Sequence, residues 1–314
     1  MNRAHVAGAL ALVTLAAAAW PAPAPAQEGA PPETAPGPAP EPSAPAPEPS
    51  AAGPSAPVAS SVGSGAPRPA PNARAQQRAQ ARAAARAQYR RRLEAYRRMR
   101  DRWHRAAPAG VVRRWQREMP PPMVLRPVQH PGEYVLVPEE DLGGFDAEDL
   151  EAARKAFTYR DGTSADVHPR LVELMYRAVR QFNAPYVHVI SGYRSTARAT
   201  SRHHQGRAVD FVLPGVSNGR LARFLRSQGF VGVGTYPVSG FVHLDVRERS
   251  YFWNDGAGPG RRSRSRTTFA AEVYRHDARA RSRGEEAVPD LVLTGPDGGL
   301  LEGGESGAEA AELP

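Results

Sequence analysis

The segment from Ser201 to Leu213 reads SRHHQGRAVDFVL, and its character changes from polar to apolar half-way along. The first half carries two adjacent histidines and ends in a Gln205-Gly206 turn. From Ala208 on, the second half is apolar enough for a buried strand, with Asp210 as the one charged residue of that stretch. A carboxylate in such a strand is costly unless it is paired, hydrogen-bonded or bound to a metal. The segment therefore predicts a turn that leads into a core strand with one functional carboxylate.

A second apolar run with polar interruptions, residues 241–246, reads FVHLDV. His243 and Asp245 are two residues apart, so they project from the same face of a strand. If the two strands are neighbours, His203, Asp210 and His243 converge. Two imidazoles and one carboxylate, with a fourth position left for water, form the ligand set of a catalytic zinc site. Simpler interpretations stay open here, because a strand histidine is often a hydrogen-bonded core residue and backbone amides alone can hold an aspartate.

The elements around these strands predict the fold class. The expected order is a helix over 166–183 that Asp166 caps, strands near 186–190, 207–213 and 241–246, and a short helix over 219–228. This order predicts one α+β domain, in which a small antiparallel sheet has flanking helices.

Composition divides the rest of the chain. The 314 residues include 32 prolines and 29 glycines but no cysteine, which excludes disulfides, thiolate metal sites and cysteine nucleophiles. The expected segments are a signal peptide (1–26), a Pro/Ala-rich disordered tether (27–72), a basic helix (73–107), a proline-broken linker (108–140), the folded domain (141–255) and a low-complexity tail (256–314) with a short helix at 267–280.

The first 26 residues have the pattern of a secretory signal. Arg3 precedes an apolar run over 6–20, and Ala24-Pro25-Ala26 is a small-x-small cleavage site. That run is shorter than the ~20 residues that span a bilayer, so cleavage is favoured over an uncleaved anchor. We expect export to the periplasm or cell envelope, no transmembrane segment in the mature chain, and no nucleic-acid partner despite the net charge of +9.

Residues 73–107 contain twelve arginines against two acids. Tyr89, Leu93, Tyr96 and Trp103 follow helical spacing, so a helix here has a narrow apolar stripe within a basic face. Two interpretations stay open. The helix binds an anionic wall polymer or anionic lipid, or it is a solvated helix that packs its stripe on the domain.

Residues 201–210 match the pattern S-x-H-x-x-G-x-A-x-D, with SGYRS upstream at 191–195 and GVGTYP and FVHLD downstream at 232–237 and 241–245. Over residues 141–253 the chain resembles the M15-type zinc peptidases, and within them a murein endopeptidase branch once catalogued as a domain of unknown function. The resemblance implies a D,D-peptidase or hedgehog-like fold, bound Zn²⁺, and peptidoglycan peptides as substrate.

The resemblance also implies roles for individual residues. The zinc ligands fall on His203, Asp210 and His243, and Ser201 is expected to hydrogen-bond around the first of them. Arg194 matches an arginine expected to bind a substrate carboxylate or steady the developing oxyanion.

The sequence departs from the better-known relatives at two positions. They hold an acidic general base three residues before the last histidine ligand, where this chain has Gly240. We expect Asp245 to act as the base, with His204 in reserve. Arg247 stands where a glycine is expected after the His-x-Asp element.

The function predicted from these residues is zinc-dependent hydrolysis of peptide bonds in peptidoglycan stem peptides or cross-links, as an endopeptidase or D,D-carboxypeptidase in cell-wall remodelling. The alternative is a non-catalytic module that binds peptidoglycan or another anionic polymer and has a vestigial or structural metal site. A third interpretation is a scaffold anchored on anionic lipid. The sequence contains no Ser-His-Asp pattern, phosphate-binding glycine loop or aromatic nucleic-acid motif.

Overall fold

The structure is a computed structural model that describes residues 71–141, 143–259, 261–267 and 270–291. The predicted signal peptide, all but the last two residues of the predicted tether, and the end of the predicted tail lie outside these ranges. Within them, every helix is too short or too polar to cross a membrane.

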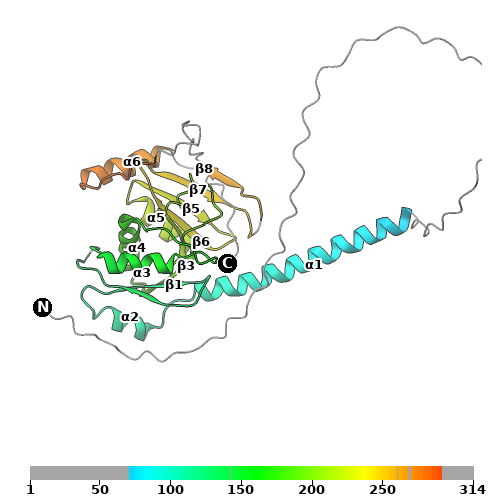
Figure 1. Ribbon diagram of the computed structural model, residues 1–314, viewed down its shortest axis with the longest axis horizontal. Helices are drawn as coiled ribbons and strands as arrows, with labels where there is room; N and C mark the ends of the chain where they lie inside the picture. The colour runs from blue at the N-terminus through cyan, green and yellow to red at the C-terminus, as the bar shows by residue number, and fades with distance from the viewer. Residues whose placement is uncertain (1–70, 142, 260, 268–269, 292–314) are drawn as a thin grey trace, which may run out of the picture. The chain divides into compact units, whose positions relative to one another are not determined.

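An eight-stranded sheet forms the centre of the fold, in the order β2-β1-β3-β4-β6-β5-β7-β8 (Figure 1). Its strands are β1 Met123–Pro127, β2 Tyr134–Leu136, β3 Tyr186–Ser191, β4 Ala208–Val212, β5 Val231–Tyr236, β6 Phe241–Val246, β7 Tyr251–Asp255 and β8 Ser265–Thr267. Neighbouring strands are antiparallel except for the pairs β1–β3 and β5–β7, which are parallel.

One face of the sheet packs against the helices α3 (Ala147–Ala156), α4 (Pro169–Phe182) and α5 (Asn218–Arg226). The strands alternate, so Val242, Leu244 and Val246 of β6 join this main core while the intervening residues face the other side. Apolar residues of α4 at helical spacing are fully buried in it: Leu171, Leu174, Met175, Ala178 and Val179.

Helix α4 begins three residues after the cap predicted from the sequence. Pro169 occupies its first turn, where a missing amide hydrogen costs nothing, and Asn183 ends it in the left-handed conformation. Asp166 therefore does not cap the helix. The predicted helix itself is confirmed.

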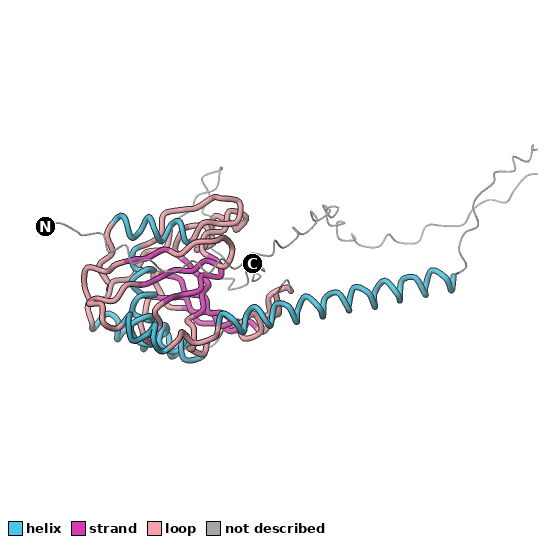
Figure 2. Tube along the Cα trace, turned by 90° about the horizontal axis from the view of Figure 1, so that it is seen from below, coloured by secondary structure: helices cyan, strands magenta, loops and turns pink. Residues whose placement is uncertain are grey.

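The opposite face of the sheet meets the C-terminal half of α1 (Pro71–Trp103), which Figure 2 follows as one uninterrupted helix. Tyr96 and Trp103 are buried there against a second, smaller cluster formed by Ile190, Val212, Tyr236 and Phe241. The residues from Arg74 to Gln88 are all exposed. Helix α1 thus lies where the sequence predicts a basic helix, and two residues of the predicted apolar stripe, Tyr96 and Trp103, pack on the domain.

The α+β class is confirmed, but the sheet is larger than predicted and mixed. The segment predicted as a linker contributes α2 (Ala109–Trp115), β1 and β2. The prolines of this segment predict a break in regular structure, but Pro122 only precedes β1 and Pro127 ends it. Between them, the alternate residues Met123 and Leu125 are buried in the core. The segment predicted as a tail contributes β8 and α6 (Ala270–Ser282).

Helix α6 is held by one buried carboxylate. Asp277 accepts hydrogen bonds from the backbone amides of Phe230 and Ser250 and from the Ser250 hydroxyl. It thereby joins the loops that precede β5 and β7 to a helix from the end of the described chain.

Candidate metal centre

Strands β4 and β6 are hydrogen-bonded neighbours, and their register pairs Asp210 with His243. Both side chains lie on the face of the sheet that α3, α4 and α5 leave uncovered. His203 reaches the same place from the turn before β4, in which the Gly206 amide donates to the His203 carbonyl at 3.3 Å. Gly206 has φ +67°, and a Cβ there would overlap the Asp166 carbonyl oxygen, so the turn requires glycine.

Three side-chain atoms from these residues form a compact triangle. His243 Nδ1 is 2.9 Å from Asp210 Oδ1 and 3.2 Å from His203 Nε2, and His203 Nε2 is 3.6 Å from Asp210 Oδ1. Ligands at the ~2.0–2.1 Å bond lengths of tetrahedral zinc lie about 3.3 Å from one another. The spacing therefore fits a zinc ion bound by all three residues, which are buried.

Hydrogen bonds on the far side of each imidazole set which nitrogen faces the triangle. His203 Nδ1 is 2.6 Å from the carbonyl oxygen of Gly192, and His243 Nε2 is 3.0 Å from Asp245 Oδ2. Since both partners are acceptors, these two nitrogens carry the hydrogens. Two imidazole lone pairs and a carboxylate oxygen then face one another, an arrangement that a cation stabilises.

The second oxygen of Asp210 is bound by the Arg194 guanidinium, whose Nε also donates to the Ser191 hydroxyl at 2.9 Å. Burial tends to raise the pKa of Asp210, but the Arg194 charge and the His203 contact outweigh it and lower this pKa. Burial, reinforced by Arg194, lowers the pKa of His203. The aspartate is therefore held ionised and the histidine neutral, the states in which both bind metal.

Both oxygens of Asp245 are also engaged. Arg247 donates to them from Nε at 2.6 Å and Nη2 at 2.5 Å, and Arg202 Nε lies 3.5 Å from Oδ1. Burial opposes ionisation, but Arg247 and His243 together lower the pKa of Asp245. Burial likewise tends to lower the pKa of His243, and its hydrogen bonds with the two aspartates reverse this and raise it.

Two glycines of β5 make room for these side chains. A Cβ at Gly232 would overlap the Asp245 carboxylate, and one at Gly234 would overlap the indole of Trp253. The Trp253 ring centroid is 5.0 Å from that of His243. Sequence reasoning missed Trp253 as a wall of the site. The signal that could have found it is the Gly-x-Gly spacing within a strand, which marks a close approach of neighbouring groups.

Comparison with known proteins agrees with this geometry. A family model described as Peptidase M15 matches residues 146–245. The peptidoglycan L,D-endopeptidases MepK of Escherichia coli (strain K12) and of Shigella flexneri are each 32% identical to this chain over 131 residues, which cover 37% of this chain and 72% of theirs. The chain belongs to the M15 peptidase family. No solved structure matches it.

In this M15 peptidase, Gly240 stands where an acidic base is expected. The space that its side chain would fill is taken by Arg100 of α1. Gly240 has φ +84°, and a Cβ there would overlap the side chain of Arg100 from α1. A side chain at this position would therefore be strained by the backbone and would force the Arg100 side chain to move. Gly240 thus leaves room for the Arg100 side chain of α1.

Helix α1 and His104, the residue that follows it, contact the three consecutive carbonyl groups of the β5–β6 turn. These contacts are Arg100 Nη1 to Val238 O (3.2 Å), the Tyr96 hydroxyl to Ser239 O (2.6 Å) and His104 Nε2 to Gly240 O (2.6 Å). Tyr96 and Arg100 are four residues apart and so lie on one face of the helix, and His104 continues this spacing in the turn after it, where its amide donates to the Arg100 carbonyl at 3.1 Å. The turn that they hold leads directly into the strand that carries His243.

The remaining predicted residues lie around the triangle. Ser201 is buried at the start of the His203 turn, where its carbonyl accepts the Gln205 amide at 3.1 Å. His204 Nδ1 is 3.1 Å from the Arg194 carbonyl oxygen, and its ring lies 5.4 Å from that of Tyr193. The structure thus groups all the sequence-predicted site residues in one region.

Proposed function

We propose that this M15 peptidase is a zinc-dependent hydrolase of peptide bonds in peptidoglycan, exported to the periplasm or cell envelope. The observation that carries the proposal is the triangle of His203 Nε2, Asp210 Oδ1 and His243 Nδ1, buried in a chain of this family. The substrate follows the MepK relatives, whose names give an L,D-endopeptidase of peptidoglycan. Export rests on the signal pattern in residues 1–26.

His203, Asp210 and His243 would hold the ion through the three atoms of the triangle. A zinc ion bound there would supply a Lewis acid for the scissile carbonyl and would lower the pKa of water to near 7. Arg194 would act through Asp210, because its contacts with Asp210 and Ser191 direct one carboxylate oxygen toward the triangle. This location supports a positioning role more directly than the grip on substrate expected from the sequence.

Two residues are candidates for carrying the proton to the leaving amine. Asp245, the predicted base, is in contact with His243 and Arg247 through both oxygens. His204, the reserve, keeps Nε2 as an acceptor when its Nδ1 donates to the Arg194 carbonyl. The proton carrier is the residue whose loss lowers kcat while metal is retained.

The test is digestion of purified muropeptides by the full chain, followed by mass spectrometry. We expect cleavage of a stem-peptide or cross-link bond, loss of cleavage with a chelator, and recovery on addition of Zn²⁺. His203→Ala and His243→Ala should lose both metal and activity, because each leaves only two ligands. Full activity of His243→Ala would refute the mechanism, and the mass of the products identifies the bond.

The glycine at position 240 favours one alternative, a non-catalytic module that binds the wall and has a structural metal site. That function predicts that the chain co-sediments with sacculi, with or without chelator, and releases no peptide. Shortened peptides in the supernatant would exclude it.

A further inference from the structure

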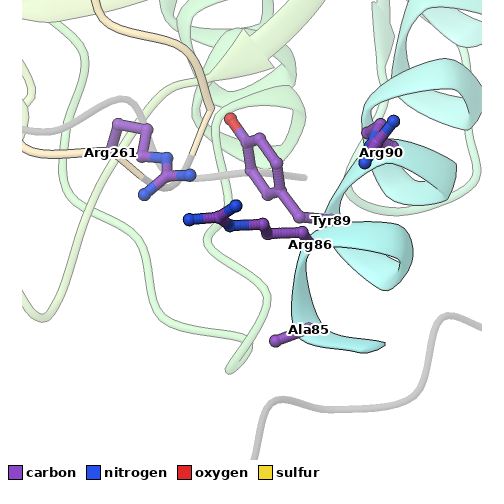
Figure 3. A pocket seen from close by; sticks show the side chains of 5 residues that line it. All are labelled: Ala85, Arg86, Tyr89, Arg90 and Arg261. Carbon is purple, nitrogen blue, oxygen red and sulfur yellow. The ribbon is translucent and has the colours of Figure 1, made fainter. Parts of the chain in front are cut away.

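A cavity of about 450 Å³ lies between α1 and the loop that follows β7 (Figure 3). Its lining residues are Ala85, Arg86, Tyr89, Arg90 and Arg261. The Arg261 guanidinium lies over the Tyr89 ring, 4.3 Å from its centroid. In Figure 3 the side chains of Arg261 and Arg86 lie on the same side of Tyr89, and Arg90 lies on its other side. We call the group of Arg86, Tyr89, Arg90 and Arg261 the arginine pocket.

The arginine pocket concentrates positive charge without an internal counter-charge. Three of its five lining residues are arginines and none is acidic. In the part of the chain that the structure describes, none of these three arginines forms an ion pair. Guanidinium groups bind carboxylates and phosphates through two parallel hydrogen bonds, so an anionic ligand would relieve the repulsion among the three.

The rest of α1 argues against a lipid as that ligand. Residues 73–88 contain only alanine, arginine and glutamine, and those from Arg74 onward are exposed. A helix that lies in a membrane interface needs an apolar face with residues such as Leu, Phe or Trp, which this segment lacks.

The position of the arginine pocket favours the wall polymer. Tyr89 precedes Tyr96 by two helical turns, about 10 Å, and Tyr96 binds the turn that leads into the His243 strand. The pocket therefore lies on the same helix that holds the turn before the His243 strand. A polymer with a carboxylate on each stem peptide could occupy both places at once.

We propose that the arginine pocket is an accessory binding site for stem-peptide carboxylates of peptidoglycan, which retains a wall strand while a neighbouring peptide occupies the metal centre. The identity of the polymer rests on the proposed function.

The test compares two full-chain variants of equal charge. Arg86→Gln/Arg90→Gln/Arg261→Gln removes the pocket charges, and Arg74→Gln/Arg78→Gln/Arg82→Gln removes three exposed charges from the same helix. Binding to purified sacculi is measured by co-sedimentation with chelator present, so that hydrolysis does not interfere. We expect at least a tenfold weaker Kd for the pocket variant, as loss of one charge-assisted hydrogen bond predicts, and less than about a twofold change for the control. Equal losses, or none, would overturn the proposal, because the attraction would then be general or absent.

Two further arms separate the ligand sources. Sacculi with amidated stem carboxylates should bind both variants equally, whereas a persisting difference would reject carboxylates as the ligand. Vesicles of phosphatidylcholine with phosphatidylglycerol should not distinguish the variants, and a pocket-dependent affinity there would assign the site to lipid. Cleavage of a small soluble muropeptide should be unchanged in both variants. If the unsubstituted chain does not cleave the muropeptide, the proposed function is rejected. The binding measurements with sacculi still test the arginine pocket by themselves.

Discussion

At the scale of single residues, two different acceptors fix the hydrogens of the ligand histidines. A backbone carbonyl holds His203, whereas the carboxylate of Asp245 holds His243. A carboxylate makes its imidazole more basic and a better ligand. Asp245 would therefore affect a metal bound at the proposed site through His243, whether or not it also carries a proton.

Asp245→Asn should weaken Zn²⁺ binding about 10–100-fold, because the charge behind His243 is lost. The affinity is measured by competition with a chromogenic chelator. Asp290→Asn is the control, since Asp290 is an exposed partner of Arg202 outside the ligand set. Unchanged affinity together with a collapse of kcat would instead identify Asp245 as the base predicted from the sequence.

At the scale of elements, the C-terminal half of α1 is part of the catalytic domain. It buries two aromatic side chains on the sheet, and its Tyr96 and Arg100 bind carbonyls of the β5–β6 turn. The conformation of Gly240 is what allows the helix to approach so closely.

Gly240→Ala should destabilise the fold by about 1–3 kcal/mol, because a Cβ is strained at positive φ and overlaps Arg100. Gly256→Ala is the matched control, since a Cβ there would meet nothing within 4 Å. Both are measured by urea unfolding of the full chain. Equal stabilities for the two variants would show that the helix does not press on this turn.

Trp103→Ala should cost about 3–5 kcal/mol, the usual range for truncating a buried aromatic residue. The same unfolding experiment measures it, and Met119→Ala, at a side chain that is 75% exposed, should stay within about 0.5 kcal/mol of the parent. A small effect at Trp103 would mean that α1 is held by its hydrogen bonds alone.

The elements differ in how far they could be predicted. The β4 and β6 strands and helix α4 follow from local periodicity, and the structure confirms them. Strands β1 and β2 were not predicted from the sequence, because the nearby prolines are typical of a linker and the alternation of buried residues in β1 is short. The parallel pairing of β1 with β3 depends on a contact between residues about 60 positions apart, which no local pattern encodes.

At the scale of the whole molecule, the chain beyond α6 returns to the domain. Glu285 binds Arg170 and Arg177 of α4, Val288 is buried in the main core, and the Pro289 carbonyl accepts from Arg207 at 2.7 Å. The end of the described chain is thus tied to the helix layer and to the strand next to the metal centre.

Glu285→Gln should destabilise the chain by about 2 kcal/mol at pH 7, because two half-buried arginines lose a charged partner. Burial tends to raise the pKa of Glu285, but its bonds to Arg170 and Arg177 outweigh this and lower it. A lowered pKa stabilises the fold above the ordinary value near 4.5 and loses that effect as the pH falls through the lowered pKa. The difference should therefore shrink toward pH 3.

Thermal unfolding across this pH range measures the effect, with Glu286→Gln as the exposed control. A difference that stays constant down to pH 3 would mean that the side chain acts through packing and not through its charge.

The residues of the candidate site could be predicted from the sequence where a polar side chain lies in an otherwise apolar strand. Asp210, His243 and Asp245 are polar residues in apolar strands, and such conflicts mark functional positions. Trp253, Arg247 as a partner of Asp245, and the contacts of Tyr96 were missed. Trp253 and Tyr96 depend on a neighbouring strand and a neighbouring helix that only the assembled sheet supplies, whereas Arg247 is two residues from Asp245 along the chain.

The carboxylate of Asp277 has a practical consequence for anyone who isolates the catalytic part. A fragment trimmed to the family match, residues 146–245, would keep every proposed metal ligand and still lack that carboxylate, together with β7 and the indole beside His243. The loop before β5 would begin without its anchor. A fragment with these bounds would contain the proposed reactive groups but lack strands and a helix that pack around them.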